Sequence, residues 1–568
     1  MLARIPASMQ VFSSLAWVAA LALLVGGVWL PAGYIFGTDF PGPRHFAFPD
    51  SITSFAGLQL ELALLNLVFP GEVVGKILIF GILVSAGLAA FHSVPTTGLV
   101  PRAVASLVYV VNPFVYDRLA YGQLTVLAGY ALLPLVASSV RRLLLEATML
   151  QAVIVGLLLS AVAVLDVHIA LIASVLVVLL VSAYMFEDRR RLESALRTGS
   201  LVLVSAAVAL LTSIYWLIPL LSGRGPEAAT LAGIGQSDLN SFSTTSDPNL
   251  GLLPNVLGLY GFWAEDTGRF ASMKDFVPLW PVALGLMLML AIAGAAAVWR
   301  RNENVDFPFS RAWLIALLSG AFLATVLGIG VADPHIAPVV DWLDSAFPPY
   351  RGMRDAQKWA AVLALVYAQL VPLGSISLMG WVKKRFQTES RREVAVAVIV
   401  AAVMVLPLYY GNGILYGMHR QILPSAYPSG WYAADRVLAT DPHPGRAVFL
   451  PWHGYLELSF VRNANRVVAS PAPLFFSVPV VASQDLEIPG IPPRENPDQM
   501  FLATLVAHGP TIDWAPQLAA HGFKYVLLAR ELDWKDYGYL DQQPGLQLVH
   551  DFGSIELYVN ALWPGRSR

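Results

Sequence analysis

One carboxylate stands where it could do chemistry at a membrane surface. Asp39 lies in the Gly- and Pro-rich segment 37–45, directly after the first long apolar run of the chain. A carboxylate at that level can stay ionised and still reach a substrate carried by a lipid; the alternative is that Asp39 only caps a turn. His45 and Asp50 follow in the same loop. A structural role suits both, and we retain them as candidate substrate contacts.

Three cations form a second candidate site, in the segment 348–359 that precedes the tenth apolar run. They are Arg351, Arg354 and Lys358. If the segment is helical, Arg354 and Lys358, four residues apart, share one face. Cations at the start of a helix, where the dipole is also positive, repel one another unless an anion such as a lipid phosphate or pyrophosphate satisfies them. The alternative is a solvated cluster neutralised by nearby acids, namely Asp341, Asp344 and Asp355.

Two further charged pairs interrupt apolar runs. Asp117 and Arg118 stand between the third and fourth runs, where a charge within the bilayer costs about 2.5–3.5 kcal/mol unless it is paired or hydrated. They either cap a helix whose tyrosines anchor it at the interface, or contact a phosphate. Asp166 and His168 mark a tight turn between two apolar runs. A capping Asp explains this turn better than a metal site or an acid–base pair does.

Composition places these residues in a membrane protein. The 568 residues are 56% hydrophobic and 13% charged, with a mean hydropathy of +0.62; an average soluble domain is about 25% charged. The chain has no cysteine, which excludes disulfides, thiolate metal sites and cysteine nucleophiles. No basic stretch interleaves with aromatic residues, so nucleic acid is not an expected partner. Nucleotide-binding and hydrolase motifs are also missing.

About eleven apolar runs approach the roughly 20 helical residues that a bilayer crossing requires. The third is short and ends in Asn112-Pro113, so we expect a broken or re-entrant helix, which lipid tolerates only where protein or water covers the freed backbone. The first is interpreted as a retained span and not as a removed signal peptide. The runs lie at 11–31, 73–92, 101–115, 120–139, 149–165, 168–186, 199–221, 278–299, 311–330, 356–381 and 393–411.

Positive charge sets the expected orientation, because Lys and Arg accumulate in short cytoplasmic loops. One set of loops is basic, whereas the opposite segments 32–72, 222–277 and 331–355 are long and carry as many acids as bases or more. This pattern places the N-terminus in the cytoplasm, and an odd number of spans places the tail outside. The basic loops hold Arg102, Arg141-Arg142, Arg189-Arg190-Arg191 with Arg197, Arg300-Arg301 with Arg311, and Lys383-Lys384-Arg385 with Arg391-Arg392.

We expect two domains, a transmembrane domain over residues 1–411 and a small extracytoplasmic α/β domain over residues 412–568. The tail lacks long apolar runs and shows the shorter patterns of strands and helices instead. The expected fold class is a mainly α polytopic membrane protein with a small C-terminal α/β domain. The expected tail elements are helices at 431–439 and 514–521, strands at 446–450 and 523–529, and a closing hairpin around 551–554.

Four features of the chain together resemble the polytopic glycosyltransferases of the GT-C type, and within them the arabinofuranosyltransferase and YfhO-like membrane proteins. The first is the acidic first external loop with Asp39, and the second is the stretch Asn112–Arg118 with Gly122. The third is the segment Arg351–Trp359, which is similar to the family's Arg-Glu-Pro-x-Lys-Phe element. The fourth is the end of the tail, Gly522–Leu528 followed by Ile555–Asn560.

The resemblance implies a membrane glycosyltransferase that moves a sugar from a polyprenyl-phosphate donor to an extracytoplasmic glycan, lipid or protein acceptor. In that scheme Asp39 is the general base that takes the proton of the acceptor hydroxyl. The phosphate leaving group is stabilised by a set of cations, Arg351, Arg354, Lys358 and Arg118. Phe40 follows Asp39 where a second acid is usual, and Asp355-Ala356 stands where Glu-Pro is usual. A divalent cation is therefore doubtful, and no other cofactor is expected.

The tail, in the same scheme, shapes the acceptor site or binds glycan through exposed aromatic residues such as Trp431, Trp452 and Trp534. Two other functions stay open. A transporter or flippase of a lipid-linked glycan would hold the same phosphate without chemistry, and its mark would be ionisable residues deep inside paired broken helices. A noncatalytic cell-envelope assembly protein would need no charged outer cluster.

Overall fold

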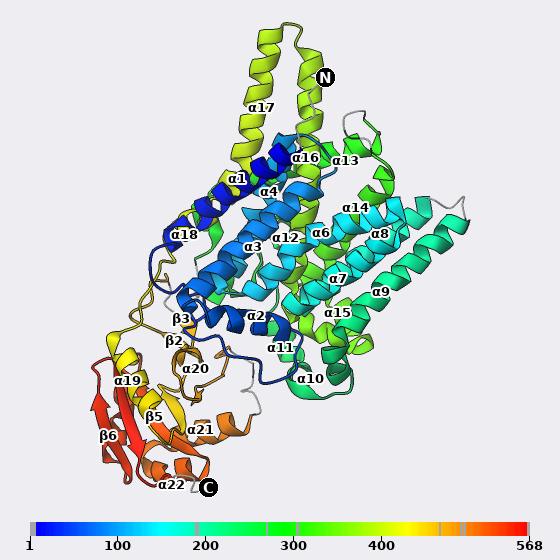
Figure 1. Ribbon diagram of the computed structural model, residues 1–568. Coiled ribbons are helices and arrows are strands. Elements are labelled where there is room, and N and C mark those ends of the chain that lie inside the picture. The colour runs from blue at the N-terminus through cyan, green and yellow to red at the C-terminus, as the bar shows by residue number, and fades with distance from the viewer. Residues whose placement is uncertain are drawn as a thin grey trace. The chain divides into compact units, whose positions relative to one another are not determined.

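The computed structural model describes residues 7–187, 192–267, 271–302, 305, 307–464, 467–488, 491 and 496–564 (Figure 1). Of the expected basic loops, Arg189–Arg191 lie outside these ranges. The chain divides into two compact units. The helical unit comprises residues 1–28, 49–59 and 77–420, and the sheet unit comprises residues 29–48, 60–76 and 421–568. Residues 29–48 and 60–76, which lie within the expected domain 1–411, belong to the sheet unit.

Long apolar helices make up the helical unit, as the hydropathy pattern predicts. Nine described helices are long and apolar enough to cross a membrane, and the bent pair α4 and α5 makes a tenth if it is counted as one span. Helix α7 is a shorter apolar helix. Each expected run coincides with a described helix, but the described residues give nine candidate spans, or up to ten, where eleven were expected. The helices are α1 (Ala7–Gly26), α3 (Gly71–Ser93), α4 (Leu99–Val110), α5 (Pro113–Tyr121), α6 (Leu124–Glu146), α7 (Met149–Leu165), α8 (Val167–Glu187), α9 (Leu192–Leu221), α13 (Trp280–Trp299), α14 (Ser310–Ile329), α16 (Ala360–Arg385) and α17 (Glu389–Tyr410).

Short helical elements occupy the segments between the long helices. Figure 1 shows α7, α8 and α9 lying side by side, and the connections that follow them fold into small turns. The short elements are α2 (Ala56–Asn66), α10 (Gly225–Ala232), α11 (Gln236–Ser241), α12 (Leu252–Leu257), η2 (Trp263–Thr267), η3 (Met273–Phe276), η4 (Gly330–Ala332), α15 (Ala337–Ala346), η5 (Pro348–Arg354), η6 (Ala356–Trp359), η7 (Asn412–Ile414) and α18 (Leu415–His419).

One side chain, Asn112, hydrogen-bonds to backbone groups on both sides of the break between α4 and α5. The two helices meet at 42°, and Asn112 lies at the bend. Its Nδ2 donates to the carbonyls of Val108 and Tyr109, at 3.0 and 2.8 Å, and its Oδ1 accepts from the Val115 amide at 3.0 Å. Pro113, at the first turn of α5, has no N–H that needs a partner there. The predicted broken helix is confirmed, and protein covers its freed backbone groups.

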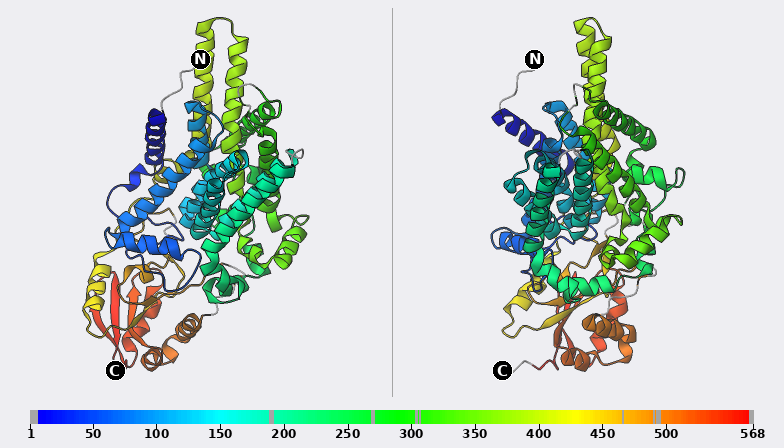
Figure 2. Two further views of the ribbon diagram at one scale, coloured as in Figure 1. Left: turned by 45° about the vertical axis from the view of Figure 1, so that its right-hand side comes forward. Right: turned by 90° about the vertical axis from the view of Figure 1, so that its right-hand side faces the viewer.

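The span that contains α16 is the most enclosed of the described spans, with 78% of its most apolar stretch buried. It runs beside α17 (Figure 2) and packs on α13 through two glycines. A Cβ on Gly294 would lie 2.2 Å from the Leu370 carbonyl oxygen, and a Cβ on Gly374 would lie 1.9 Å from the Leu290 carbonyl oxygen. No side chain fits at either position, so the two backbones touch, as small residues allow between membrane helices.

The sheet unit is built on a five-stranded mixed sheet in the order β4-β1-β5-β7-β6. β1 pairs in parallel with β4 and β5, whereas β7 pairs antiparallel with β5 and β6. β4 is therefore an edge strand, and β2 and β3 form a separate antiparallel pair. The strands are β1 (Arg446–Leu450), β2 (Tyr455–Glu457), β3 (Val467–Ala469), β4 (Val480–Val481), β5 (Phe523–Ala529), β6 (Leu546–Asp551) and β7 (Ile555–Asn560).

Helices cover both faces of this sheet, because its central strands carry apolar side chains on two sides. Ala447 and Phe449 of β1 lie in the core that includes α19 and α20, and Val448 and Leu450 lie in the core that includes α21 and α22. Figure 2 shows α19 and α22 on opposite sides of the strands. The helical elements are α19 (Ser429–Thr440), α20 (Ala472–Phe475), α21 (Pro497–His508), η8 (Gly509–Thr511), α22 (Trp514–Ala520) and η9 (Trp534–Gln542).

The predicted elements of the tail are confirmed, since α19, α22, β1, β5 and the β6–β7 hairpin occupy the expected positions. The prediction that Trp431 is exposed for glycan binding is wrong. Trp431 is 0% exposed and stacks on Phe476 in the core beneath α19. Trp452 and Trp534 are half-buried and pack against the opposite core, so neither is a free aromatic platform.

The segment 29–48 belongs to the sheet unit through hydrogen bonds to residues almost 400 positions later. The Trp29 indole donates to the Ile422 carbonyl at 2.8 Å, and the Tyr427 hydroxyl lies 2.9 and 2.8 Å from the carbonyls of Pro41 and Gly42. These bonds hold the first external loop, which carries Asp39, against the C-terminal sheet.

A histidine between two carboxylates ties together two loops of the sheet unit. His453 Nδ1 lies 3.1 Å from Glu487, and its Nε2 lies 3.2 Å from Asp533. The hydrogen bond with Glu487 raises the pKa of His453 to about 9, with help from Asp533 and against the opposing effect of burial. A raised pKa in the folded state contributes stability that is complete below the ordinary pKa of 6.5 and is lost as pH rises through about 9.

We therefore expect His453→Gln to lower the thermal stability of the full-length protein below pH 6.5 and to have little effect above pH 9, where the wild-type histidine is neutral. The measurement is tryptophan-monitored unfolding in detergent micelles across this pH range. His443→Gln, which alters an exposed histidine of the same unit, is the matched control. A difference in thermal stability between wild type and His453→Gln that stays the same at every pH would contradict the raised pKa of His453.

Candidate functional site

Helix α5 forms the first part of the site, and local sequence fixes both of its ends. Asn112 caps the first turn, and Gly122, with φ of 86°, ends the helix in the left-handed region that suits glycine. The amides of Gly122 and Gln123 donate to the Arg118 carbonyl at 3.0 and 2.8 Å. Between these ends, Asp117 and Arg118 are each 0% exposed.

The Arg118 guanidinium is enclosed by acceptors and by an aromatic ring. It donates to both carboxylate oxygens of Asp355, one of them at 3.2 Å, and to the side-chain carbonyls of Gln123 and Gln357. The Phe262 ring centroid lies 4.4 Å from its central carbon. Among the described residues only its Nε lacks an acceptor. A two-pronged contact of this kind compensates the buried charge without water.

Gln357 contacts both buried charged residues of α5, Asp117 and Arg118. Its Oε1 accepts from Arg118, and its Nε2 lies 3.4 Å from Asp117 Oδ2 and 3.0 Å from the Leu259 carbonyl. The other carboxyl oxygen of Asp117, Oδ1, has no hydrogen-bond partner within the described part of the chain. A buried carboxyl oxygen in this position needs a water or a proton as its partner.

Lys358 differs from the arginines of the site. It is 7% exposed, and among the described residues its Nζ has neither a hydrogen-bond acceptor within 3.5 Å nor a carboxylate within 4.0 Å. Its charge is attracted by Asp355 and Asp166, and it is repelled by Arg118 and Arg354. A buried ammonium without a direct partner is the part of the site best suited to take up an anion.

Asp166 caps α8 and supplies negative charge near Lys358. Its Oδ1 accepts from the amides of His168 and Ile169, at 3.0 and 2.9 Å, and lies 3.2 Å from His168 Nδ1. Burial alone would raise the pKa of Asp166, but His168, Lys358 and the Ile169 amide lower it to about 2. The predicted capping turn is confirmed, and the same carboxylate takes part in the electrostatics of the site.

The segment 348–359 is two 3-10 turns that meet at Asp355, so the spacing of Arg354 and Lys358 is not that of an α-helical turn. Arg354 pairs with Asp238 at 2.5 Å, and Arg351 pairs with Asp344 at 3.0 Å. Of the acids expected to neutralise the cations, Asp344 and Asp355 do form pairs, the latter with Arg118.

Residues that the sequence did not single out complete the polar interior. Besides Asp238, they are Lys274 with its neighbours Asp247, at 3.0 Å, and Glu265, at 3.9 Å. All of them come from the segment 222–277, whose abundance of acids was the only signal in the sequence.

Asp39 lies at an exposed turn of the sheet unit. The Tyr455 hydroxyl of β2 donates to Asp39 Oδ1 at 2.8 Å, and the Ala469 amide of β3 donates to the Thr38 carbonyl at 2.7 Å. The carboxylate is therefore held by the β2–β3 pair while it stays open to solvent.

The other two candidates of the first loop have different surroundings. The His45 amide donates to the Leu474 carbonyl at 2.8 Å, and its ring Nε2 is buried with no hydrogen-bond partner among the described residues. Burial and the neighbouring Arg44 lower the pKa of His45 below its usual 6.5. Asp50 is exposed and belongs to the helical unit.

The predicted site residues thus fall into two groups. Arg118, Arg354 and Lys358 act on one another within the helical unit, and Arg351 lies on the adjoining turn. Asp39 and His45 belong to the sheet unit. Within the described ranges, no three His, Asp or Glu side chains are arranged to hold a metal ion.

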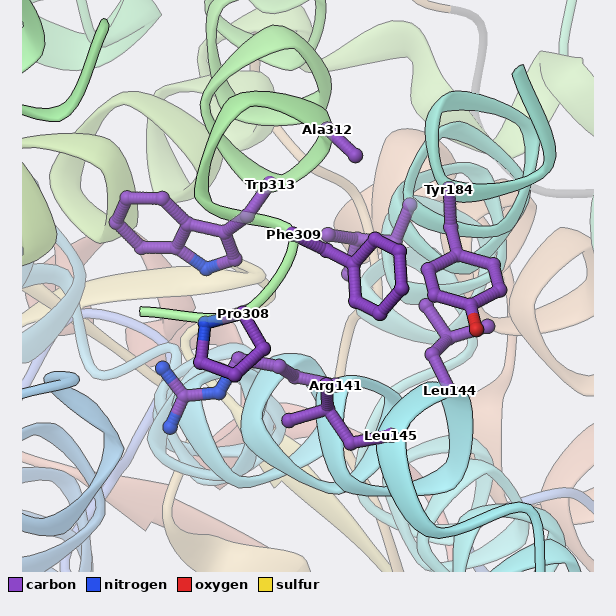
Figure 3. A pocket seen from close by; sticks show the side chains of 9 residues that line it. Arg141, Leu144, Leu145, Tyr184, Pro308, Phe309, Ala312 and Trp313 are labelled. Atoms are coloured by element: carbon purple, nitrogen blue, oxygen red, sulfur yellow. The ribbon is translucent and has the colours of Figure 1, made fainter. Parts of the chain in front are cut away.

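A pocket near the far end of α6 is a poor substrate site. Figure 3 shows it lined by Arg141 and by apolar side chains that include Phe309 and Trp313. Arg141 lies about 25 Å along α6 from Leu124, at about 1.5 Å per residue. The free volume of the pocket, about 20 Å³, has room for about one water molecule.

The fold is similar to that of a solved arabinofuranosyltransferase. AftD from Mycobacteria superposes with a TM-score of 0.59 at 15% identity, covering 96% of this chain and 40% of that chain. A mutant of the same protein gives a TM-score of 0.60 at 16% identity, covering 96% and 41%, and a second class of that mutant gives 0.52 at 13%, covering 98% and 42%. The chain therefore spans about two-fifths of these proteins.

No protein-family model and no curated protein sequence matches the chain. The solved structures nevertheless confirm the predicted fold, a GT-C-like polytopic membrane protein with a C-terminal α/β domain.

The buried pair Arg118–Asp355 provides a test of the site's architecture. We expect Arg118→Met to lower the free energy of unfolding by about 3–5 kcal/mol, because it leaves the Asp355 carboxylate buried without its partner. The double variant Arg118→Met with Asp355→Leu removes both charges and should recover much of the loss. The free energies of unfolding of the single and double variants are measured in mixed micelles with increasing SDS.

Arg351→Met is the matched control, because the Arg351 side chain is 38% exposed in its pair with Asp344. It should change stability by less than about 1 kcal/mol. A double variant at Arg118 and Asp355 that is no more stable than Arg118→Met would show that the two side chains do not depend on each other.

Proposed function

We propose that the chain is a membrane glycosyltransferase that moves a sugar from a polyprenyl-phosphate donor to an extracytoplasmic glycan, lipid or protein acceptor. The acceptor oxygen attacks the anomeric carbon and forms a new C–O bond, while the bond between that carbon and the phosphate oxygen breaks. The electron pair of the broken bond leaves with the lipid phosphate, and the proton of the acceptor hydroxyl passes to a base. No further reactant is needed.

The observation that carries the proposal is the buried Lys358 ammonium, in a fold shared with an arabinofuranosyltransferase. A phosphate beside Lys358 would supply the hydrogen-bond acceptor that the described residues do not, and the ammonium would offset the charge that builds up as the phosphate leaves. Arg354 and Arg351, whose ion pairs are partly exposed, can add donors to the same phosphate. Arg118 acts through Asp355, whose position it fixes.

Asp39 is the general base in this proposal. It is exposed, it accepts a hydrogen bond from Tyr455, and a base needs hydrogen-bond reach to the acceptor hydroxyl more than it needs a large pKa shift. In this proposal His45 and Asp50 are secondary substrate contacts. The loops rich in Lys and Arg support an orientation with the N-terminus in the cytoplasm and the sheet unit outside.

Asp39→Asn should reduce transfer by about 10²–10⁴-fold, because the amide cannot take the proton, while donor binding stays unchanged. The assay uses right-side-out vesicles, a panel of labelled polyprenyl-phosphate sugars, and acceptors added outside. Asp536→Asn, at another exposed carboxylate of the sheet unit, is the control. Transfer by Asp39→Asn at the wild-type rate would remove Asp39 as the base, and transfer only in inverted vesicles would overturn the orientation.

Lys358→Met should weaken donor binding by about 10- to 100-fold, the value of one hydrogen bond to a charged group. Binding of the donor panel is measured in the Asp39→Asn background, where turnover does not interfere. Lys358→Arg keeps a cation and should restore part of the affinity. Equal affinities of wild type and Lys358→Met for every donor would mean that Lys358 does not contact the phosphate.

A transporter of a lipid-linked sugar is the second candidate function. Asp117 and Arg118 favour it, because fully buried charges beside a broken helix are typical of transport pathways. The two functions differ in product. A transporter moves the labelled lipid between leaflets of a proteoliposome and forms no glycosidic bond, so mass analysis of the products separates them.

A further inference from the structure

A groove in the sheet unit is lined in part by Tyr455, which also holds the proposed base. It has a volume of about 340 Å³, within the range of about 300–1,000 Å³ typical of small-molecule sites. The edge strand β4 lines one side, the β2–β3 pair lines another, and the start of α21 contributes Asn496 and Asp498. All of these elements belong to the sheet unit.

The groove and Asp39 share their supports. Tyr455 lines the groove and donates to Asp39 Oδ1, and Ala469, which also lines it, donates its amide to the Thr38 carbonyl. A molecule in the groove therefore lies next to the two residues that hold the carboxylate.

The groups that line the groove suit a neutral polyhydroxyl molecule. They include the hydroxyls of Ser470 and Ser483, the amide of Gln484 and the carboxylate of Asp485. Ser470 Oγ has no partner within the described part of the chain, and rotation about χ1 can turn it toward the groove. Hydroxyls and amides donate to and accept from sugar hydroxyls, and carboxylates accept from them. The Asp485 carboxylate disfavours an anionic ligand, whereas Asp498, which also lines the groove, is paired with Arg446.

The far wall of the groove is held in place before any ligand arrives. A Cβ on Gly454 would lie 1.8 Å from the Asp485 carbonyl oxygen, so the two backbones touch. The Gln499 side chain accepts from the backbone amide of Gln484 at 2.9 Å and donates to the Ala482 carbonyl at 2.8 Å. A site fixed in this way loses little conformational freedom when it binds.

We propose that this groove binds the saccharide acceptor and presents one of its hydroxyls to Asp39. The inference rests on the proposed function for the role of Asp39, and it adds that the acceptor is a carbohydrate and that the sheet unit holds it. Peptide and lipid acceptors are the alternatives that the test below separates.

The test measures binding without a donor, so that it does not depend on transfer. Saturation-transfer NMR on the full-length protein in nanodiscs uses methyl α-D-arabinofuranoside and methyl α-D-mannopyranoside as probes, with a tetra-alanine peptide and a short-chain phosphatidylcholine for comparison. We expect at least one glycoside to bind. Gln484→Ala should weaken its binding about threefold to tenfold, the value of one hydrogen bond, and Ser470→Phe should abolish it by filling the groove.

Gln517→Ala makes the same substitution at an exposed glutamine of α22, outside the groove, and should bind as wild type does. Asp39→Asn should also retain binding, because the base is not needed to hold the sugar. Unchanged melting temperatures show that the variants fold. The inference is overturned if no glycoside binds, if only the peptide or the lipid binds, or if Gln484→Ala and Ser470→Phe bind as tightly as wild type. Glycoside binding lost in these variants, together with an absence of transfer from every donor, would retain the groove and reject the transferase.

Discussion

The structure of the helical unit depends on holding charge where water is scarce. Arg118 can lie at 0% exposure only because Asp355, Gln123 and Gln357 take four of its N–H groups. Those partners in turn require the turn that ends α5 and the two 3-10 turns before α16 to lie against each other, so one guanidinium fixes the geometry of both segments. Lys358, three residues after Asp355, is consequently placed in a region where the nearby acids are already engaged with other groups.

The sheet unit gives an irregular loop a single conformation. Residues 29–48 contain many Gly and Pro residues and no regular element longer than a turn, yet Tyr34 and Phe36 are buried in the core of the C-terminal sheet. The loop is therefore stabilised by packing against a domain that follows some 400 residues later in the chain. Asp39 is exposed but anchored, a combination that suits a group required to meet a substrate at a fixed angle.

Much of the fold was predictable because its signals are local. A span needs about 20 apolar residues in sequence, and the bend after α4 follows from Asn112-Pro113. β1 and β5 are short apolar runs bounded by turn residues, and both were predicted to the residue. Strands β2, β3 and β4, of two or three residues, are too short to show a period. Asp238 and Arg354 lie far apart in sequence, so no local pattern could pair them, and Trp431 on an amphipathic helix could equally have faced solvent.

The two glycines between α13 and α16 have a mechanical consequence. Because the backbone at Gly294 and Gly374 leaves no gap, these helices cannot slide along each other without a collision, and they behave as a single rigid strut. Lys358 is attached to one end of that strut through η6. Any rearrangement of the helical unit must therefore come from the helices around this pair, while Lys358 keeps its position relative to α13.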